Sequence, residues 1–160
     1  MRALAFTAAL VALVIAAVFA FEAKAGPPWG PETPHFNLEV VLRGEGFGLV
    51  KFRQPNDADK IVYLDTWVRG LAPNTSYRLE RIADTTVDGN CTGSPWVTLG
   101  KGLTPAAITT DDKGTGRAQL FRNLGSTNVG TTFDIKFHVI NATTSAVVLE
   151  SACYQYTVSQ

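Results

Sequence analysis

Histidine and net charge are the scarcest features of this sequence. Only two histidines occur in 160 residues, and 14 basic side chains balance 14 acidic ones, so the formal net charge is zero. A neutral chain has no general electrostatic attraction to nucleic-acid phosphates or to anionic membranes. The composition also excludes collagen, coiled coils and a disordered tail. We therefore expect no nucleic-acid partner and no membrane association of the processed chain.

The first 25 residues have the organisation of a signal peptide. Arg2 precedes a continuous apolar run from Ala3 to Phe21, and Ala23-Lys24-Ala25 forms an A-x-A cleavage site. The alternative is a retained membrane anchor, because about 19 apolar residues can just span a bilayer. We favour cleavage, since the site directly follows the run. The expected location is periplasmic or secreted.

A proline-rich leader, residues 26–35, follows the signal peptide and carries half of the eight prolines. Proline lacks a backbone donor and favours extended chain, so this leader is not expected to join a core. The remaining segment, 36–160, is long enough for one domain with a hydrophobic core and too short for two.

Cysteine is as scarce as histidine, with Cys91 and Cys153 as the only pair. In an exported protein an isolated pair most simply forms a disulfide, although two free thiols are the alternative. Closing a loop of about 62 residues would stabilise the fold by about 4 kcal/mol in the chain-entropy model. The separation is too large for a C-x-x-C redox motif.

Apolar and polar residues alternate with a period of two along most of the chain, which predicts β-strands. The expected strands cover residues 36–43, 49–53, 60–70, 77–80, 96–99, 107–109, 116–122, 131–141 and 147–158. The last strand changes phase near Glu150-Ser151, which indicates a bulge. No window after the signal segment has helical spacing. We therefore predict an all-β, antiparallel Greek-key sandwich or flattened barrel of about eight strands with one disulfide.

Two aromatic residues stand on the outward face of the strand at 60–70. Tyr63 and Trp67 alternate with the inward residues Val62, Leu64 and Val68. Aromatic side chains on a sheet face can bind a glycan or a partner protein. The alternative, which we favour, is that a second sheet or a loop packs over them, the long loop around Cys91 being the candidate.

Several short motifs occur in a fixed order along the chain. They are G-x-V-x-F-x-Q at 48–54, G-L-x-P at 70–73, Cys91-Thr92-Gly93-Ser94, Ile108-Thr109-Thr110-Asp111 with Gly114 and Ala118, His138, and Ser151-Ala152-Cys153. In this order the chain resembles the Greek-key barrel of copper–zinc superoxide dismutases. A generic immunoglobulin-like sandwich is the alternative, because G-L-x-P followed by an aromatic residue also occurs there.

The resemblance also shows which metal ligands are replaced. The family's H-x-H copper ligands follow the G-L-x-P turn, where this chain has Arg78 and Glu80. A guanidinium has no lone pair for a metal. Residues 95–100, in the region of the bridging and zinc ligands, contain no histidine, and Leu149-Glu150 replaces the substrate-guiding arginine. Redox copper needs several imidazoles held together, so the resemblance implies a barrel that has lost its metals.

The candidate site is the altered face that carries Arg78, Glu80 and His138, with Tyr63 and Trp67 as a second candidate surface. No G-x-S-x-G elbow occurs, and His138 is predicted to be a solvated histidine beside Asp134 and Lys136. We therefore expect an exported, non-catalytic protein with a binding or structural role, no cofactor, and an unknown protein or glycan partner. The alternative is a metal-binding or dismutase-related enzyme that uses the face around Arg78, Glu80 and His138.

Overall fold

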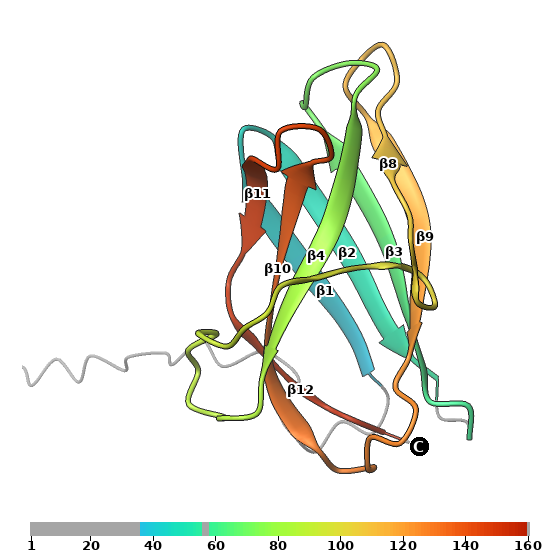
Figure 1. Cartoon of the computed structure of the whole chain (residues 1–160), viewed down its shortest axis with the longest axis vertical. Coiled ribbons are helices and arrows are strands. Elements are labelled where there is room, and N and C mark those ends of the chain that lie inside the picture. The colour runs from blue at the N-terminus through green and yellow to red at the C-terminus, as the bar shows by residue number, and fades with distance from the viewer. Residues whose placement is uncertain (1–35, 56–57, 160) are drawn as a thin grey trace, which may run out of the picture.

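The computed structural model describes residues 36–55 and 58–159. The predicted signal peptide and proline-rich leader lie outside these residues. In the described ranges the chain is all-β, as predicted, and its strands form one sheet that curls into a nearly closed barrel (Figure 1). No helix that could cross a membrane occurs in these ranges.

Twelve strands make up the sheet in the described residues. The eight longer ones are β1 (Phe36–Gly44), β2 (Phe47–Gln54), β3 (Ile61–Arg69), β4 (Ser76–Asp84), β9 (Gly116–Asn123), β10 (Thr132–Asn141), β11 (Val147–Ser151) and β12 (Tyr154–Thr157). The connection from β4 to β9 adds β5 (Val97–Thr98), β6 (Gly100–Lys101), β7 (Thr104–Pro105) and β8 (Ile108–Thr109). The predicted strands at 96–99 and 107–109 overlap β5 and β8. The expected number of about eight is too low because β6 and β7 are too short to show alternation and because the predicted strand at 147–158 is divided into β11 and β12.

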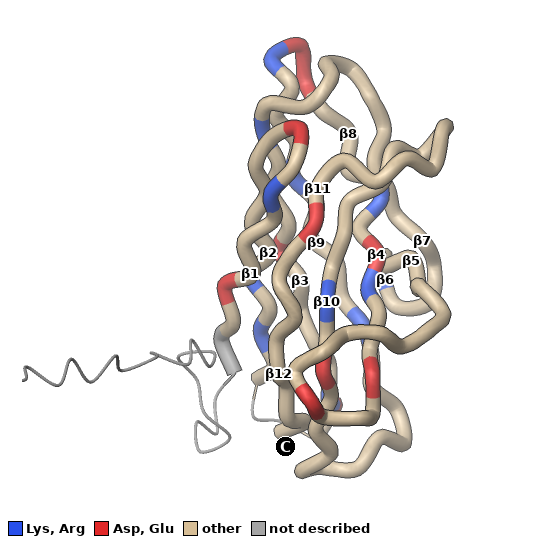
Figure 2. Tube along the Cα trace, turned by 90° about the vertical axis from the view of Figure 1, so that its left-hand side faces the viewer, with Lys and Arg blue, Asp and Glu red and all other residues tan. Residues whose placement is uncertain are grey.

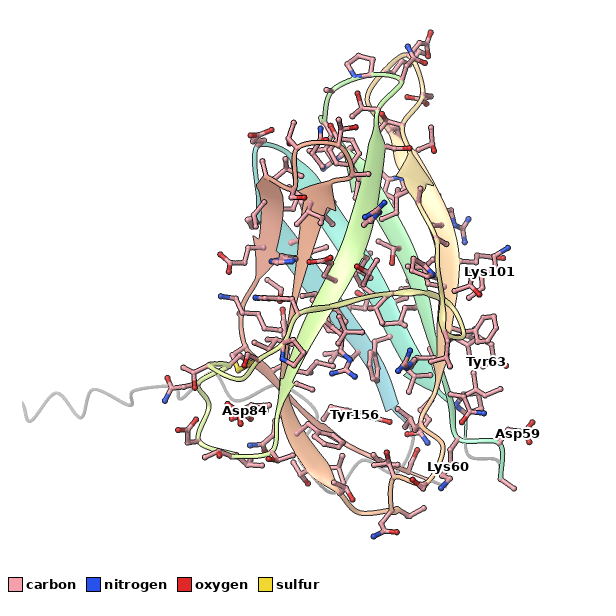
Figure 3. The ribbon with its side chains drawn as sticks, viewed as in Figure 1. Asp59, Lys60, Tyr63, Asp84, Lys101 and Tyr156 are labelled. Atoms are coloured by element: carbon pink, nitrogen blue, oxygen red, sulfur yellow. A yellow bond between two sulfur atoms is a disulfide. The ribbon has the colours of Figure 1, made fainter. Side chains whose placement is uncertain are left out.

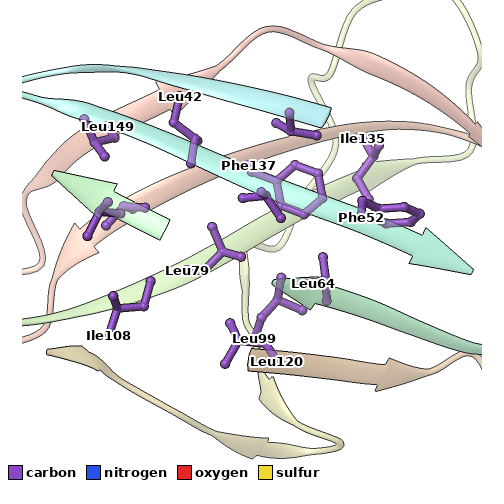
Figure 4. Close-up of a cluster of buried hydrophobic side chains, with 14 of the residues drawn as sticks. Leu42, Phe52, Leu64, Leu79, Leu99, Ile108, Leu120, Ile135, Phe137 and Leu149 are labelled. Atoms are coloured by element: carbon purple, nitrogen blue, oxygen red, sulfur yellow. The ribbon is translucent and has the colours of Figure 1, made fainter. Parts of the chain in front are cut away.

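The inward-pointing residues of the alternating strands form the core of the barrel. Val40, Val50, Leu64 and Phe137 come from four strands, and each is buried. Figure 4 shows how such side chains from opposite sides of the barrel meet in its interior. The period of two therefore decides which side of each long strand is buried, as expected from the sequence.

The longer strands pair in the order β4-β10-β11-β1-β2-β3-β9, and each of these contacts is antiparallel. Residues 97–102 bridge the two ends of this path, crossing in front of the barrel in Figure 1. On one side β5 pairs with β4, and on the other β6 pairs with β9 in parallel. The sheet is therefore mixed, whereas the sequence predicted an antiparallel one.

The line along which β4 faces β9, here called the β4–β9 seam, is bridged over only part of its length. Leu99 N donates to Leu79 O (2.8 Å) and Gly102 N donates to Phe121 O (3.0 Å) in the middle of the seam. Near the start of β4, β8 pairs with Ser76 and Tyr77. Towards the end of β4, residues 82–84 pair with β10 alone, so the barrel wall is open there.

Gly100 lets β6 lie close against β7. A Cβ atom at this position would lie 1.9 Å from Thr104 O and 2.7 Å from Pro105 Cα. Only a residue without a side chain therefore fits at this position of β6, opposite Pro105 of β7.

The predicted phase change in the last strand occurs at Ala152-Cys153. β11 places Glu150 opposite His138, whereas β12 places Tyr154 opposite Ile135. An advance of three residues along β10 therefore corresponds to four residues from β11 to β12. The one extra residue is what defines a β-bulge. The interruption lies slightly beyond the predicted Glu150-Ser151.

The predicted disulfide is present between Cys91 and Cys153. Cys91 lies in the loop between β4 and β5, and Cys153 lies at the interruption between β11 and β12. The bond therefore ties the loop that precedes the seam bridge to the wall of the barrel.

Replacing both cysteines by serine should destabilise the protein by about 4 kcal/mol, because the separation of 62 residues leaves a large loop free in the unfolded chain. Urea denaturation of the oxidised wild type and of the Cys91→Ser/Cys153→Ser variant measures this difference. Equal unfolding free energies of the two proteins would contradict it.

Candidate functional site

The structure brings together part of the predicted face. Glu80 on β4 lies directly opposite His138 on β10, and Arg78 lies opposite Ile140. Tyr63 and Trp67 are on β3, which pairs with β2 and β9. The two candidate surfaces are thus on strands that are not neighbours, and they do not form one site.

Glu80 and His138 form a close pair beneath the β4–β5 loop. Glu80 Oε2 lies 2.7 Å from His138 Nε2, and Thr98 Oγ1 donates to Glu80 Oε1 at 2.7 Å. The Trp96 indole stacks on the imidazole at 3.6 Å between ring centroids and an interplanar angle of 11°. His138 is only 6% exposed. The prediction of a solvated histidine is therefore wrong, because the loop covers the outward face of β10.

The environment of Glu80 favours its ionised form. Burial raises the pKa of the carboxyl group, but hydrogen bonds from His138 and Thr98, with the charges of His138 and Arg78, outweigh burial and lower the pKa overall. The Glu80 carboxylate is hydrogen-bonded to Nε2 of His138, and the Trp96 indole covers one face of the imidazole ring. This arrangement holds β4, β5 and β10 together. In the described residues no three His, Cys, Asp or Glu side chains gather as metal ligands.

Asp134 fixes the same loop at a second point. Its side chain is fully buried, although the alternation of β10 places it on the outward face. Asp134 Oδ2 accepts hydrogen bonds from Asp88 N (2.8 Å) and Gly89 N (2.6 Å). The loop that the disulfide tethers is therefore also bound to the barrel by a buried carboxylate.

The aromatic residues of β3 are accompanied by arginines. The Arg69 guanidinium lies 5.3 Å from the Trp67 ring centroid, and that of Arg53 lies 5.9 Å from that of Tyr63. Tyr63 is 38% exposed and points away from the barrel in Figure 3. The expectation that the loop around Cys91 covers these residues is wrong, because that loop lies against β10 instead.

A cavity inside the barrel is the main feature that the sequence analysis missed. Its volume is about 340 Å³, and it extends from the interior towards the open part of the β4–β9 seam. Its principal apolar lining residues are Phe52, Leu64, Leu99, Phe133, Phe137 and Tyr156. Tyr156 lies within the lower end of the barrel in Figure 3, where burial raises the pKa of its hydroxyl group.

Two arginines, Arg81 on β4 and Arg122 on β9, also line this cavity. Both side chains are half-buried. Burial and the nearby charge of Arg122 lower the pKa of Arg81. Neither guanidinium forms a hydrogen bond or ion pair within the described part of the chain. The sequence does contain a signal for this position. Tyr77 and Leu79 point into the barrel, and the same alternation places the side chain of Arg81 on the inward face.

Basic and acidic residues are otherwise interspersed over the barrel (Figure 2). Arg117 pairs with Asp65 at 2.5 Å, and Lys136 pairs with Glu150 at 2.6 Å. Other basic residues, Arg78 among them, also lack an acidic partner within the described residues, but Arg78 is exposed, whereas Arg81 and Arg122 are half-buried and line the cavity.

No protein-family model matches this chain, and a comparison with curated proteins finds no match either.

Replacing Glu80 by glutamine should reduce the loss of unfolding free energy that occurs as the pH is lowered into the acidic range. The pKa of Glu80 is lower in the folded protein than in the unfolded chain, so ionisation of Glu80 stabilises the fold. This stabilisation is fully present above the ordinary glutamate pKa of 4.5, and it is lost as the pH falls through the pKa of Glu80 in the folded protein. At neutral pH we expect Glu80→Gln to cost on the order of 1 kcal/mol, and this cost should disappear in acid. Urea unfolding from about pH 7 to about pH 3 measures both effects.

Glu45→Gln is the matched control, because Glu45 is exposed and its carboxylate forms no ion pair within the described residues. A Glu80→Gln profile parallel to that of the wild type at every pH would contradict the account of this pair.

Proposed function

We propose that this protein is an exported, non-catalytic binding protein that holds a small, largely apolar ligand inside its barrel. The cavity behind the β4–β9 seam is the observation that carries this proposal. Its volume of about 340 Å³ falls within the range of small-molecule sites, about 300–1,000 Å³. Such sites combine mostly apolar walls with a few polar groups, as this cavity does.

The proposed architecture is a Greek-key barrel like that of copper–zinc superoxide dismutases. Strand order supports this proposal: β1, β2 and β3 follow one another, the chain then crosses to β4 beside β10, and β9 returns beside β3. Such returns of distant strands are typical of Greek-key connections. A scaffold of this kind can host a new binding site after its original chemistry is lost.

Export is supported by the signal-like first 25 residues and by the disulfide, which is compatible with an oxidising compartment. The absence of catalysis is proposed from the geometry of the Glu80–His138 pair. The imidazole is buried under Trp96, and its Nε2 is occupied by Glu80. A general base must instead be within hydrogen-bond reach of a substrate proton.

Binding of a neutral fluorescent probe, N-phenyl-1-naphthylamine, tests the proposed function. The mature wild-type protein should bind it saturably with one site per chain, since apolar surface is transferred from water into the cavity. Ala83→Trp should weaken binding about tenfold or more by filling part of the cavity.

The matched control is Ala107→Trp, which places the same side chain at an exposed position outside the cavity. Probe binding by this variant should equal that of the wild type. A linear, non-saturable fluorescence response, or equal binding by the Ala83→Trp variant, would overturn the proposal.

A further inference from the structure

We infer that the ligand of this cavity is an amphipathic anion, whose apolar body fills the barrel and whose oxyanion head group lies between Arg81 and Arg122. This inference rests on the proposed function of the cavity. It goes further by naming the chemical class of the ligand and the two residues that recognise it.

Both arginines start from the inward face of the barrel wall. Arg81 lies opposite the buried Phe137 on β10, and Arg122 lies opposite the buried Val62 on β3. Neighbouring strands direct paired side chains to the same face, so the stems of both arginines begin among core residues. At these inward positions an apolar side chain would normally be expected.

The opening in the β4–β9 seam begins at the level of these arginines. β5 ends its pairing with β4 at Arg81, and β6 pairs with β9 at Phe121, one residue before Arg122. Beyond these points neither β4 nor β9 has a partner across the seam. The two arginines therefore flank the place where a ligand can enter the cavity.

Two cations without a counter-ion are an unfavourable arrangement at an apolar cavity. Taking a charge out of water costs free energy unless the charge is paired, and two guanidinium groups in proximity repel each other. No described acidic side chain pairs with either group. An anion between Arg81 and Arg122 would offset both costs.

The geometry of guanidinium indicates which anions fit best. Its planar set of donors matches the two oxygens of a carboxylate or a phosphate, which it can bind in a bidentate manner. A bare inorganic anion would leave the apolar walls formed by Phe52, Leu64, Leu99 and Phe133 without contact. A molecule with one such head group and an apolar body satisfies both parts of the cavity.

Three ligands with the same ten-carbon chain test the inference: decanoate, monodecyl phosphate and decanol, each measured by displacement of the neutral probe. In the wild-type protein at least one of the two anions should bind about tenfold or more tightly than decanol, because charge-assisted hydrogen bonds are available only to an anion. The tighter of the two identifies the head group. Added salt should weaken binding of the anions but not of decanol.

Substitution of each arginine separates recognition from folding. Arg81→Met and Arg122→Met should each remove most of the anion preference while leaving decanol and the neutral probe bound. Without ligand, each variant should unfold at a higher temperature than the wild type, because an unpaired cation has been replaced by an apolar side chain. Arg53→Met, on the outer face of β2, is the control and should keep the anion preference.

Each failure has a distinct meaning. Equal affinity of decanol and both anions in the wild type would overturn the inference, while the proposed function stands if the neutral probe still binds. Anion preference that survives in both methionine variants would also overturn it. Absence of binding by the probe and by all three ligands would overturn the proposed function itself.

Discussion

An inward position in a closed β-barrel must be apolar or must have its polar groups compensated, and Arg81 and Arg122 satisfy neither condition. Both lie where the β4–β9 seam is open and where a cavity of about 340 Å³ reaches the barrel wall. The proposed binding function follows from this conflict. A ligand with an apolar body and an anionic head group would satisfy the walls and the two cations together.

The shape of the cavity depends on the loop between β4 and β5. Asp134 and the stacking of Trp96 on His138 attach this loop to β10, and the disulfide attaches it to Cys153 between β11 and β12. Its continuation crosses the seam, where Leu99 lines the cavity. Glu80 and His138 thus support the bridge beside the opening.

Period-two alternation predicted the long strands, the inward faces of β1, β2, β3, β4 and β10, and a phase change within 147–158, because burial imposes the same period on any half-buried strand. It could not predict that a loop would cover the outward face of β10, since His138 and Asp134 look like surface residues in the sequence. β6 is only two residues long, so its sequence could not indicate that it pairs in parallel with β9. Arg81 was predictable in principle, because alternation from Tyr77 places it inside.

The most direct test of the central claim is to observe the arginine side chains themselves. In ¹H–¹⁵N spectra of the Nε–Hε groups, titration with decanoate should shift the resonances of Arg81 and Arg122 and leave those of outward arginines such as Arg53 in place. Decanol should leave all of them nearly unchanged. Decanoate binding without a change at Arg81 and Arg122 would contradict the account.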